Sequence, residues 1–214
     1  KNNIYLFRDL ELYSRIAKNK KIIAVTGTNG KSTTSKLISN ILSLNSIDNF
    51  LGGNIGIPLL DFIKNNNDDK YHVIELSSFQ LESIISFSPF ISILLNISED
   101  HLDRYDSFED YVLQKEKIIQ FNKNGINIVC LNGSRTIEIY KKYKEKIIPI
   151  SNNPIKRGIY FDNNVIVDNY FKNKLDFKID SISKSLFGDF NIENILVAYV
   201  VTRILDLKYG YTLR

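Results

Sequence analysis

The sequence contains no methionine and a single cysteine, and each shortage narrows what the chain can be. Cys130 alone cannot form an internal disulfide, so we expect a protein of a reducing compartment, the cytoplasm. Its apolar neighbours favour a buried strand residue over a reactive thiol. Because methionine is missing even at the first position, which is Lys1, we expect a piece of a longer polypeptide.

Long apolar runs and one-sided charge are also missing. The longest hydrophobic segment, residues 84–97, is interrupted by serines, Pro89 and Asn96. It is too short to span a bilayer, so we expect no membrane insertion. The 28 basic and 24 acidic residues are interspersed, and without a basic stripe we expect no nucleic-acid partner. The formal charge of +4 suits an anionic small-molecule ligand. Separately, we expect the protein to be a monomer.

The apolar periodicity predicts an α/β fold, with a mostly parallel sheet that carries helices on both faces. The expected helices cover residues 6–17, 33–44, 58–64, 79–86, 107–121, 134–144 and 191–205. The expected strands of the parallel sheet are residues 22–25, 49–51, 71–76, 91–96 and 126–131. Shorter, turn-separated strands follow at residues 147–150, 158–161, 165–167, 170–171 and 175–182, with a hairpin tip at 162–164. They predict a small flanking antiparallel sheet.

The most informative segment is residues 22–34, which read IIAVTGTNGKSTT. An apolar strand ends in a glycine turn, and Lys31 and Ser32 open an apolar-periodic helix. This order builds a phosphate cradle, because backbone N–H groups face the anion, Lys31 adds a positive charge and Ser32 can hold Mg²⁺. Val25 stands where the general P-loop pattern has its first glycine.

Other polar side chains follow predicted strands, at the edge where open α/β sheets bind ligands. Glu75 ends a strand that otherwise reads as buried, and with a P-loop nearby Mg²⁺ is a better partner for it than a basic side chain. Residues 96–103 supply several acids and His101, although a polar loop that caps the next segment explains them equally well. Spacing alone makes Lys115 a solvated helix residue.

Four motifs occur together in the order seen in the Mur ligase family, which this chain resembles over nearly its whole length. They are TGTNGKST at residues 26–33, GGNIGIP at 52–58, ELSSFQL at 75–81 and NISEDHLDRY at 96–105. The second and third motifs are most similar to the members that add D-glutamate. The resemblance implies that residues 1–20 are the tail of an N-terminal UDP-binding domain with its linker. Residues 21–214 would be the central ATP-binding domain, without the C-terminal domain.

The resemblance also implies roles for single residues. Lys31, Glu75, His101 and Lys115 would be catalytic, and two Mg²⁺ ions would be held by Ser32, Glu75, His101 and Lys115, the last as a CO₂-derived carbamate whose oxygens suit this hard cation. The substrate would lie near Asn54, Ser77, Gln80 and His101. ATP would be bound by Gly27, Thr28, Asn29, Gly30, Lys31, Ser32, Thr33, Asn191 and Asn194. Phe190 replaces a histidine that is usual in the family, which leaves the detail of nucleotide seating open.

The implied reaction is ATP-dependent addition of D-glutamate to UDP-N-acetylmuramoyl-L-alanine through an acyl phosphate, and we expect this piece alone to be inactive. A related ligase such as folylpolyglutamate synthase shares the P-loop and remains an alternative. A non-catalytic nucleotide-binding module is a second alternative, although it has no need for second-metal ligands. A general P-loop kinase would leave the other three motifs unexplained.

Overall fold

The computed structural model describes residues 8–18, 20–62, 70–171, 176–178 and 189–207. Its helices are α1 (Asp9–Ile16), α2 (Lys31–Leu44), α4 (Ser78–Leu81), α5 (Phe108–Gln120), α6 (Ser134–Tyr143), the short 3₁₀ helix η1 (Lys144–Lys146) and α7 (Asp189–Ile204). Its strands are β1 (Lys21–Thr26), β2 (Asn49–Gly53), β3 (Tyr71–Glu75), β4 (Ile91–Leu94), β5 (Ile126–Cys130), β6 (Ile147–Ser151), β7 (Ile159–Asp162), β8 (Val165–Asp168) and β9 (Asp176–Lys178).

These strands form one sheet in the order β2-β3-β1-β4-β5-β6-β7-β8-β9. Every pairing from β2 to β7 is parallel. The central strand β1 lies between β3 and β4, with Val25 beside both Glu75 and Ile93. The segments that follow β1, β2, β3 and β4 therefore meet at one edge of the sheet, where parallel sheets bind ligands.

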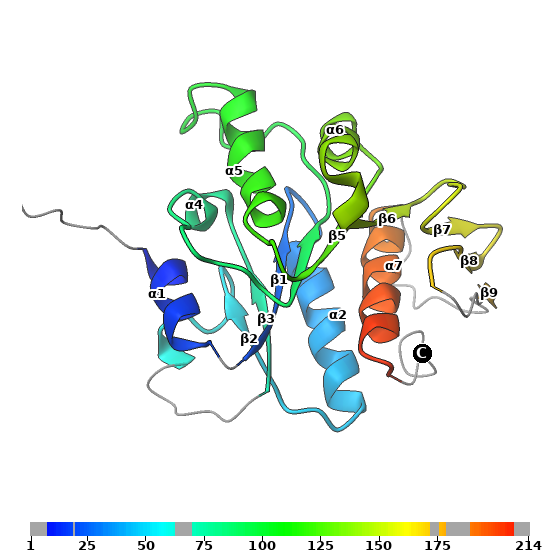
Figure 1. Ribbon diagram of the computed structural model, residues 1–214, viewed down its shortest axis with the longest axis horizontal. Helices are drawn as coiled ribbons and strands as arrows, with labels where there is room; N and C mark the ends of the chain where they lie inside the picture. The colour runs from blue at the N-terminus through cyan, green and yellow to red at the C-terminus, as the bar shows by residue number, and fades with distance from the viewer. Residues whose placement is uncertain (1–7, 19, 63–69, 172–175, 179–188, 208–214) are drawn as a thin grey trace, which may run out of the picture.

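Helices cover both faces of the sheet, which confirms the predicted fold class. Helices α1, α4, α5 and α6 pack on one face, and α2 and α7 pack on the other (Figure 1). Within β1, Ile22 and Ala24 enter the first core, whereas Ile23 and Val25 enter the second. This strand is therefore buried on both sides, and it reads as a continuous apolar run.

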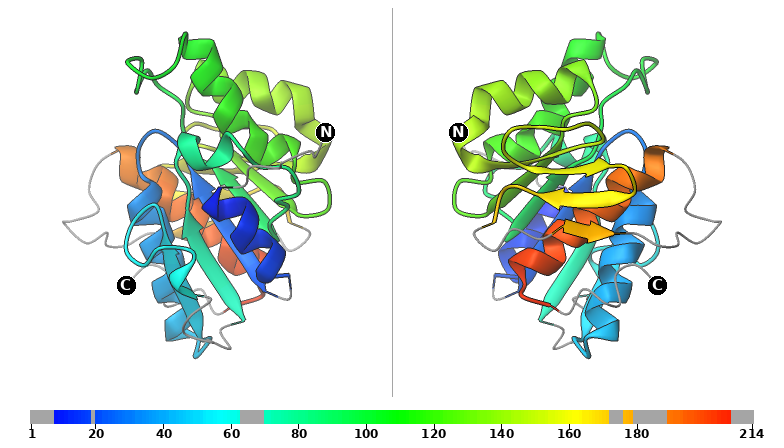
Figure 2. Two further views of the ribbon diagram at one scale, coloured as in Figure 1. Left: turned by 90° about the vertical axis from the view of Figure 1, so that its left-hand side faces the viewer. Right: turned by 90° about the vertical axis from the view of Figure 1, so that its right-hand side faces the viewer.

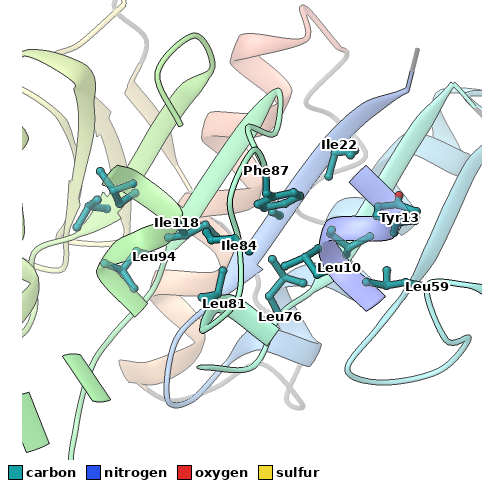
Figure 3. Close-up of a cluster of buried hydrophobic side chains, with 14 of the residues drawn as sticks. Leu10, Tyr13, Ile22, Leu59, Leu76, Leu81, Ile84, Phe87, Leu94 and Ile118 are labelled. Carbon is teal, nitrogen blue, oxygen red and sulfur yellow. The ribbon is translucent and has the colours of Figure 1, made fainter. Parts of the chain in front are cut away.

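Helix α1 is built into the first core. Leu10 and Tyr13 are fully buried, and in Figure 3 they point toward Ile22, Leu59 and Leu76. Glu11 fixes the helix to the segment after α4, because its carboxylate accepts hydrogen bonds from the amides of Ile85 and Ser86 and from the Ser86 hydroxyl. Helix α1 thus shares a core with the sheet.

The antiparallel strands are predicted correctly, but they do not form a sheet of their own. Strand β7 pairs with β6 in parallel over two residue pairs, and β8 and β9 then add antiparallel strands to the same sheet (Figure 2). The hairpin tip is confirmed: Asn163 and Asn164 both have positive φ, 47° and 63°, as tight hairpin turns require. The prediction that residues 147–150 belong to the flanking antiparallel sheet, because the runs there are short, alternating and separated by turns, is wrong. Strand β6 is fully buried and pairs in parallel with β5.

Smaller differences concern the ends of elements. Strand β2 extends through Gly53, so the first two glycines of the second motif are strand residues. Helix α4 ends at Leu81, and residues 170–171 form a bend instead of a strand. Parts of the expected helices at 6–17 and 58–64 and of the strand at 175–182 lie outside the described residues. Within the described ranges, no helix is long and apolar enough to cross a bilayer.

Candidate functional site

The glycine loop after β1 has the form of an anion cradle. Gly30 precedes α2 with a φ of 82°, a left-handed conformation that favours glycine, and no side chain caps the helix. A Cβ on Gly27 would lie 2.9 Å from the Leu95 Cβ, so this position also needs glycine. The first N–H groups of the 14-residue helix therefore face the loop without a side-chain acceptor, as phosphate binding requires.

Two lysines lie against this loop. The Lys31 ammonium donates a hydrogen bond of 2.9 Å to the main-chain oxygen of Thr28. The Lys115 ammonium, from α5, donates one of 2.8 Å to the main-chain oxygen of Gly27. Spacing alone made Lys115 a solvated residue, which is wrong: its exposed fraction is 2%. Burial, and next the Lys31 charge, lower the pKa of Lys115 to about 7, against smaller opposing effects of Asp100 and Glu75.

Glu75, at the end of β3, is hydrogen-bonded to residues that follow β1 and β2. Its carboxylate accepts a hydrogen bond of 2.8 Å from the Ser32 hydroxyl on one oxygen and one of 3.0 Å from the Asn54 amide on the other. The side chain is 1% exposed, and a buried carboxylate at such a place needs positive charge or several donors. The predicted metal ligands Ser32 and Glu75 are thus adjacent, with Asn54 beside them.

Glycine at position 53 permits the approach of Asn54. Gly53 has a φ of 111°, and a Cβ there would lie 2.3 Å from the main-chain oxygen of Glu75. The main-chain N–H of Asn54 donates a hydrogen bond to that same oxygen. The second glycine motif therefore holds β2 against the end of β3 and brings the Asn54 side chain to the Glu75 carboxylate.

His101 lies at the rim of the site. It has a φ of 53°, and its ring centroid is 4.9 Å from that of Phe79 and 6.2 Å from that of Tyr111. Tyr111 in turn lies 3.0 Å, oxygen to oxygen, from the Thr28 hydroxyl. His101 is therefore one aromatic contact away from the P-loop, and its Nε2 is 3.5 Å from an Asp100 oxygen.

Ser77 and Gln80 serve the local structure in this conformation. Ser77 caps α4 by accepting a hydrogen bond from the Gln80 backbone N–H, and the Gln80 side-chain oxygen accepts one from the Ser77 backbone N–H, which makes a complete capping box. The Gln80 amide also donates to Asp9 of α1. A contact with substrate, which their motif implies, stays a prediction.

The start of α7 approaches the P-loop from the distant end of the chain. Asn194 accepts a hydrogen bond of 2.8 Å from the Thr34 hydroxyl, and its oxygen would lie 2.7 Å from a Cβ on Gly30. Asn191 accepts from the Asn194 amide. Asn194, one of the expected ATP-binding residues, thus lies beside the loop, and Asn191 lies next to Asn194. The side chain of Phe190 lies outside the described part of the structure.

The sequence did not single out Glu193, which bridges the loop after β4 to the loop after β5. The amides of Asn96 and Asn132 donate to its two carboxylate oxygens, at 3.3 and 2.7 Å. Its one signal in the sequence is its position between Asn191 and Asn194, the two expected ATP-binding residues near the end of the chain. Burial raises the pKa of Glu193, and the two amide hydrogen bonds oppose that effect.

The donor set suits a hard cation bound next to phosphate. Within the described ranges, no three His, Cys, Asp or Glu side chains gather as a ready metal cluster. The oxygen atoms of Ser32 and Glu75 are nevertheless adjacent at a P-loop, and Mg²⁺ is commonly bound by one or two protein oxygens together with substrate phosphates. The residues present therefore fit a nucleotide-bound magnesium ion. A cavity of about 590 Å³ opens beside them, lined by Ser32, Thr33, Lys36, Leu37, Asn40, Leu51, Ile55, Gly56 and Ile57.

Comparison with known proteins gives consistent similarities. A family model described as the Mur ligase middle domain matches residues 25–202. The chain is 41% identical over 212 residues to a UDP-N-acetylmuramoylalanine–D-glutamate ligase of Rickettsia bellii, with 96% of this chain and 46% of that protein covered. It is 36% identical to the protein of the same name from Clostridioides difficile, with 95% and 46% covered.

Solved structures share the fold. A UDP-N-acetylmuramoyl-L-alanyl-D-glutamate–2,6-diaminopimelate ligase superposes with a TM-score of 0.72 at 21% identity, over 95% of this chain and 47% of the other. A MurF ligase from Thermotoga maritima in complex with ADP gives 0.69 at 18% identity, over 95% and 50%. The chain spans about half the length of the curated relatives it matches.

Proposed function

The chain belongs to the Mur ligase family through its middle domain, and we propose that the protein containing it joins D-glutamate to UDP-N-acetylmuramoyl-L-alanine at the expense of ATP. The observation that carries this proposal is the buried Lys115 amine, which lies 2.8 Å from the main-chain oxygen of Gly27 and close enough to Glu75 to interact with its charge. A P-loop that only binds nucleotide has no use for a second lysine that is buried beside Lys31. The names of the relatives support the choice of acceptor and amino acid.

We propose the domain division that the motifs imply. Residues 1–20 would be the end of an N-terminal UDP-binding domain with its linker, and residues 21–214 the central ATP-binding domain. Helix α1, which belongs to that segment, packs into the central core and would support β1. The neighbouring domains of such a ligase would supply the uridine and D-glutamate contacts.

The nucleotide phosphates would lie on the loop of residues 27–33. The N–H groups at the start of α2 would bind the phosphate oxygens, and the Lys31 ammonium would exchange its hydrogen bond with Thr28 for one with phosphate. Ser32 and Glu75 would hold the first Mg²⁺. A bound magnesium ion supplies charge neutralisation for phosphoryl transfer. Asn191 and Asn194 would fix the adenine side.

Lys115 would carry a carbamate in the working enzyme. Its amine is buried beside Lys31, and the pKa of about 7 leaves much of it neutral and able to add CO₂ near neutral pH. The neutral amine nitrogen forms a bond to the CO₂ carbon and releases one proton to solvent. The product is an anion beside Lys31, so the repulsion between two ammonium groups becomes an attraction. This carbamate and His101 would hold a second Mg²⁺.

The reaction that follows is acyl transfer through an acyl phosphate, which is a mixed anhydride. The γ-phosphoryl group of ATP passes to the terminal carboxylate of UDP-N-acetylmuramoyl-L-alanine and ADP is released. The amine of D-glutamate then attacks the carbonyl carbon and loses a proton. Phosphate leaves from the tetrahedral intermediate and the amide remains. Lys31 would stabilise the negative charge of the transferred group, while Asn54, Ser77 and Gln80 would orient the alanyl carboxylate.

We propose further that the protein acts in the cytoplasm, since its one cysteine is free and buried. We also propose that it acts as a monomer. Burial raises the pKa of the Cys130 thiol well above its usual value, which keeps it unreactive. This agrees with the strand position expected from the sequence.

Two assays test the function. In the full-length protein, phosphate release from ATP should require UDP-N-acetylmuramoyl-L-alanine and D-glutamate together, and stimulation by a folate acceptor instead would establish the folylpolyglutamate synthase alternative. In the present chain, calorimetric titration should show Mg²⁺-dependent binding of a non-hydrolysable ATP analogue that is lost in Lys31→Ala and kept in the surface control Lys141→Ala. Turnover by this chain alone would contradict the proposal that it needs its neighbouring domains.

A further inference from the structure

A chain of polar side chains runs along the edge of the sheet, across the carboxyl ends of four neighbouring strands. It starts at the P-loop after β1, where the main-chain N–H of Asn29 donates a hydrogen bond of 2.8 Å to the side-chain oxygen of Asn96. The Asn96 amide group donates back to the Asn29 oxygen at 3.2 Å and to Glu193 at 3.3 Å. Beyond Glu193 the chain continues through Asn132, after β5, to the amide nitrogen of Asn152, after β6.

Among the residues joined by these hydrogen bonds, Glu193 is the one whose ionised side chain has no hydrogen to donate. The oxygen of Asn96 faces the Asn29 N–H and the oxygen of Asn132 faces the Asn152 N–H, so both asparagines must point their amide groups at Glu193. A carboxylate offers an acceptor oxygen to each of them, whereas a glutamine would turn its own NH₂ group toward one. Glu193 is 5% exposed, so the NH₂ group of a glutamine at this position would have little access to water if it found no acceptor.

The orientation of Asn96 in turn fixes the P-loop. Asn96 binds the backbone of Asn29 through both of its side-chain atoms, and its main-chain oxygen accepts from the Thr28 amide at 2.9 Å. If its amide flipped, an oxygen would face the Glu193 carboxylate and an NH₂ group would face the Asn29 N–H. The carboxylate therefore excludes the flipped state, although in the described ranges the hydrogen bonds of Glu193 go to Asn96 and Asn132 and not to the loop itself.

We propose that Glu193 is a positioning residue for ATP, which holds the Thr28–Asn29 part of the P-loop in its phosphate-binding shape through the side chain of Asn96. This inference rests on the proposed function of the loop. Asn191 and Asn194 would contact the nucleotide directly. Glu193, which lies between them in the sequence, would instead act on the phosphate-binding loop through Asn96.

The test uses the present chain with the substitution Glu193→Gln and the control Glu138→Gln, an exposed glutamate of α6. We expect the dissociation constant of a non-hydrolysable ATP analogue with Mg²⁺ to rise roughly tenfold in Glu193→Gln and to stay unchanged in the control. Hydrogen exchange of the Asn29 amide, followed by NMR without nucleotide, should become faster. A purely structural role would lower the melting temperature without changing this amide selectively.

A reciprocal exchange separates positioning from loss of folding. In Asn96→Asp two carboxylates face each other, and binding should be weaker than in Glu193→Gln. Adding Glu193→Gln to Asn96→Asp lets the glutamine donate to the new aspartate, so the double variant should bind more tightly than Asn96→Asp alone. Additive effects in the double variant, or an Asn29 amide as protected in Glu193→Gln as in the wild type, would overturn the inference. A wild type that binds no analogue would count against the proposed function instead, and Asn29 exchange would still decide the role of Glu193.

Discussion

The side-chain nitrogen of Lys115 lies 2.8 Å from the main-chain oxygen of Gly27, and this hydrogen bond ties the middle of α5 to the first residue of the P-loop. The two residues are 88 positions apart in the chain. Their contact places a buried amine next to Lys31, which is the feature that separates this site from a simple phosphate cradle.

Lys115 should form a carbamate. In solution with ¹³C-labelled bicarbonate, we expect one carbamate resonance in the carbon NMR spectrum of the wild type, because the lowered pKa leaves the amine neutral above about pH 7. The resonance should be absent from Lys115→Met and present in Lys117→Met, whose lysine lies two positions along the same helix. A spectrum without the resonance in the wild type would contradict the proposed second metal site.

Glu75 should confer the magnesium dependence of nucleotide binding. Glu75→Gln keeps the shape of the side chain and an oxygen for Asn54 but removes the charge, so we expect affinity for the ATP analogue to fall at least tenfold with Mg²⁺. Without metal, the affinity should be unchanged or slightly improved, since a negative charge near phosphate is gone. Titrations with and without Mg²⁺ measure both values, and Glu145→Gln on the surface is the control. Equal losses under the two conditions would mean that Glu75 supports the loop and not the ion.

Glu11 should stabilise the fold in a pH-dependent way. Burial by itself raises the pKa of Glu11, but hydrogen bonds from Ser86, from the Ile85 and Ser86 amides and from Arg15 together lower it from 4.5 to about 2. The folded state therefore favours the charged form. This stabilisation is complete above about pH 4.5 and is lost as the pH falls toward 2.

Urea unfolding at a series of pH values measures this effect. Between about pH 4.5 and 2, the free energy of unfolding should fall more steeply in the wild type than in Glu11→Gln. Glu99→Gln, an exposed residue, should keep the wild-type slope. Parallel slopes in the wild type and Glu11→Gln would show that α1 is not held through this carboxylate.

Gly53→Ala should destabilise the protein more than Gly56→Ala does. Both glycines have positive φ, 111° and 70°, so both substitutions carry the cost of about 1 kcal/mol for a side chain in that region. Only at Gly53 would the added Cβ meet backbone, 2.3 Å from the Glu75 oxygen, whereas nothing lies within 4 Å of it at Gly56. We expect the free energy of unfolding to fall by about 3 kcal/mol for Gly53→Ala. Similar costs at the two positions would mean that β2 can move away from β3.

The sequence by itself determined the elements and the local chemistry. Apolar periodicity is set by which faces of a strand or helix must be buried, so β1, α2 and α5 could be read within a few residues of their ends. The P-loop could be read too, because Gly30, Lys31 and Ser32 are neighbours and their geometry depends on a single turn. Strand ends predicted that Glu75 would face the same edge, and the contact with Ser32 confirms their proximity.

The tertiary structure alone decided which distant residues meet. Nothing local distinguishes Lys115 from the other lysines of a charged helix, because its burial depends on how α5 packs across β1 and β4. Glu193 is likewise an ordinary glutamate in an apolar helix until α7 brings it between Asn96 and Asn132. Periodicity records which face of an element is buried but not which partner buries it. The partners of Lys115 and Glu193 are set by the order of strands in the sheet, which the sequence specifies only through the energy of the whole fold.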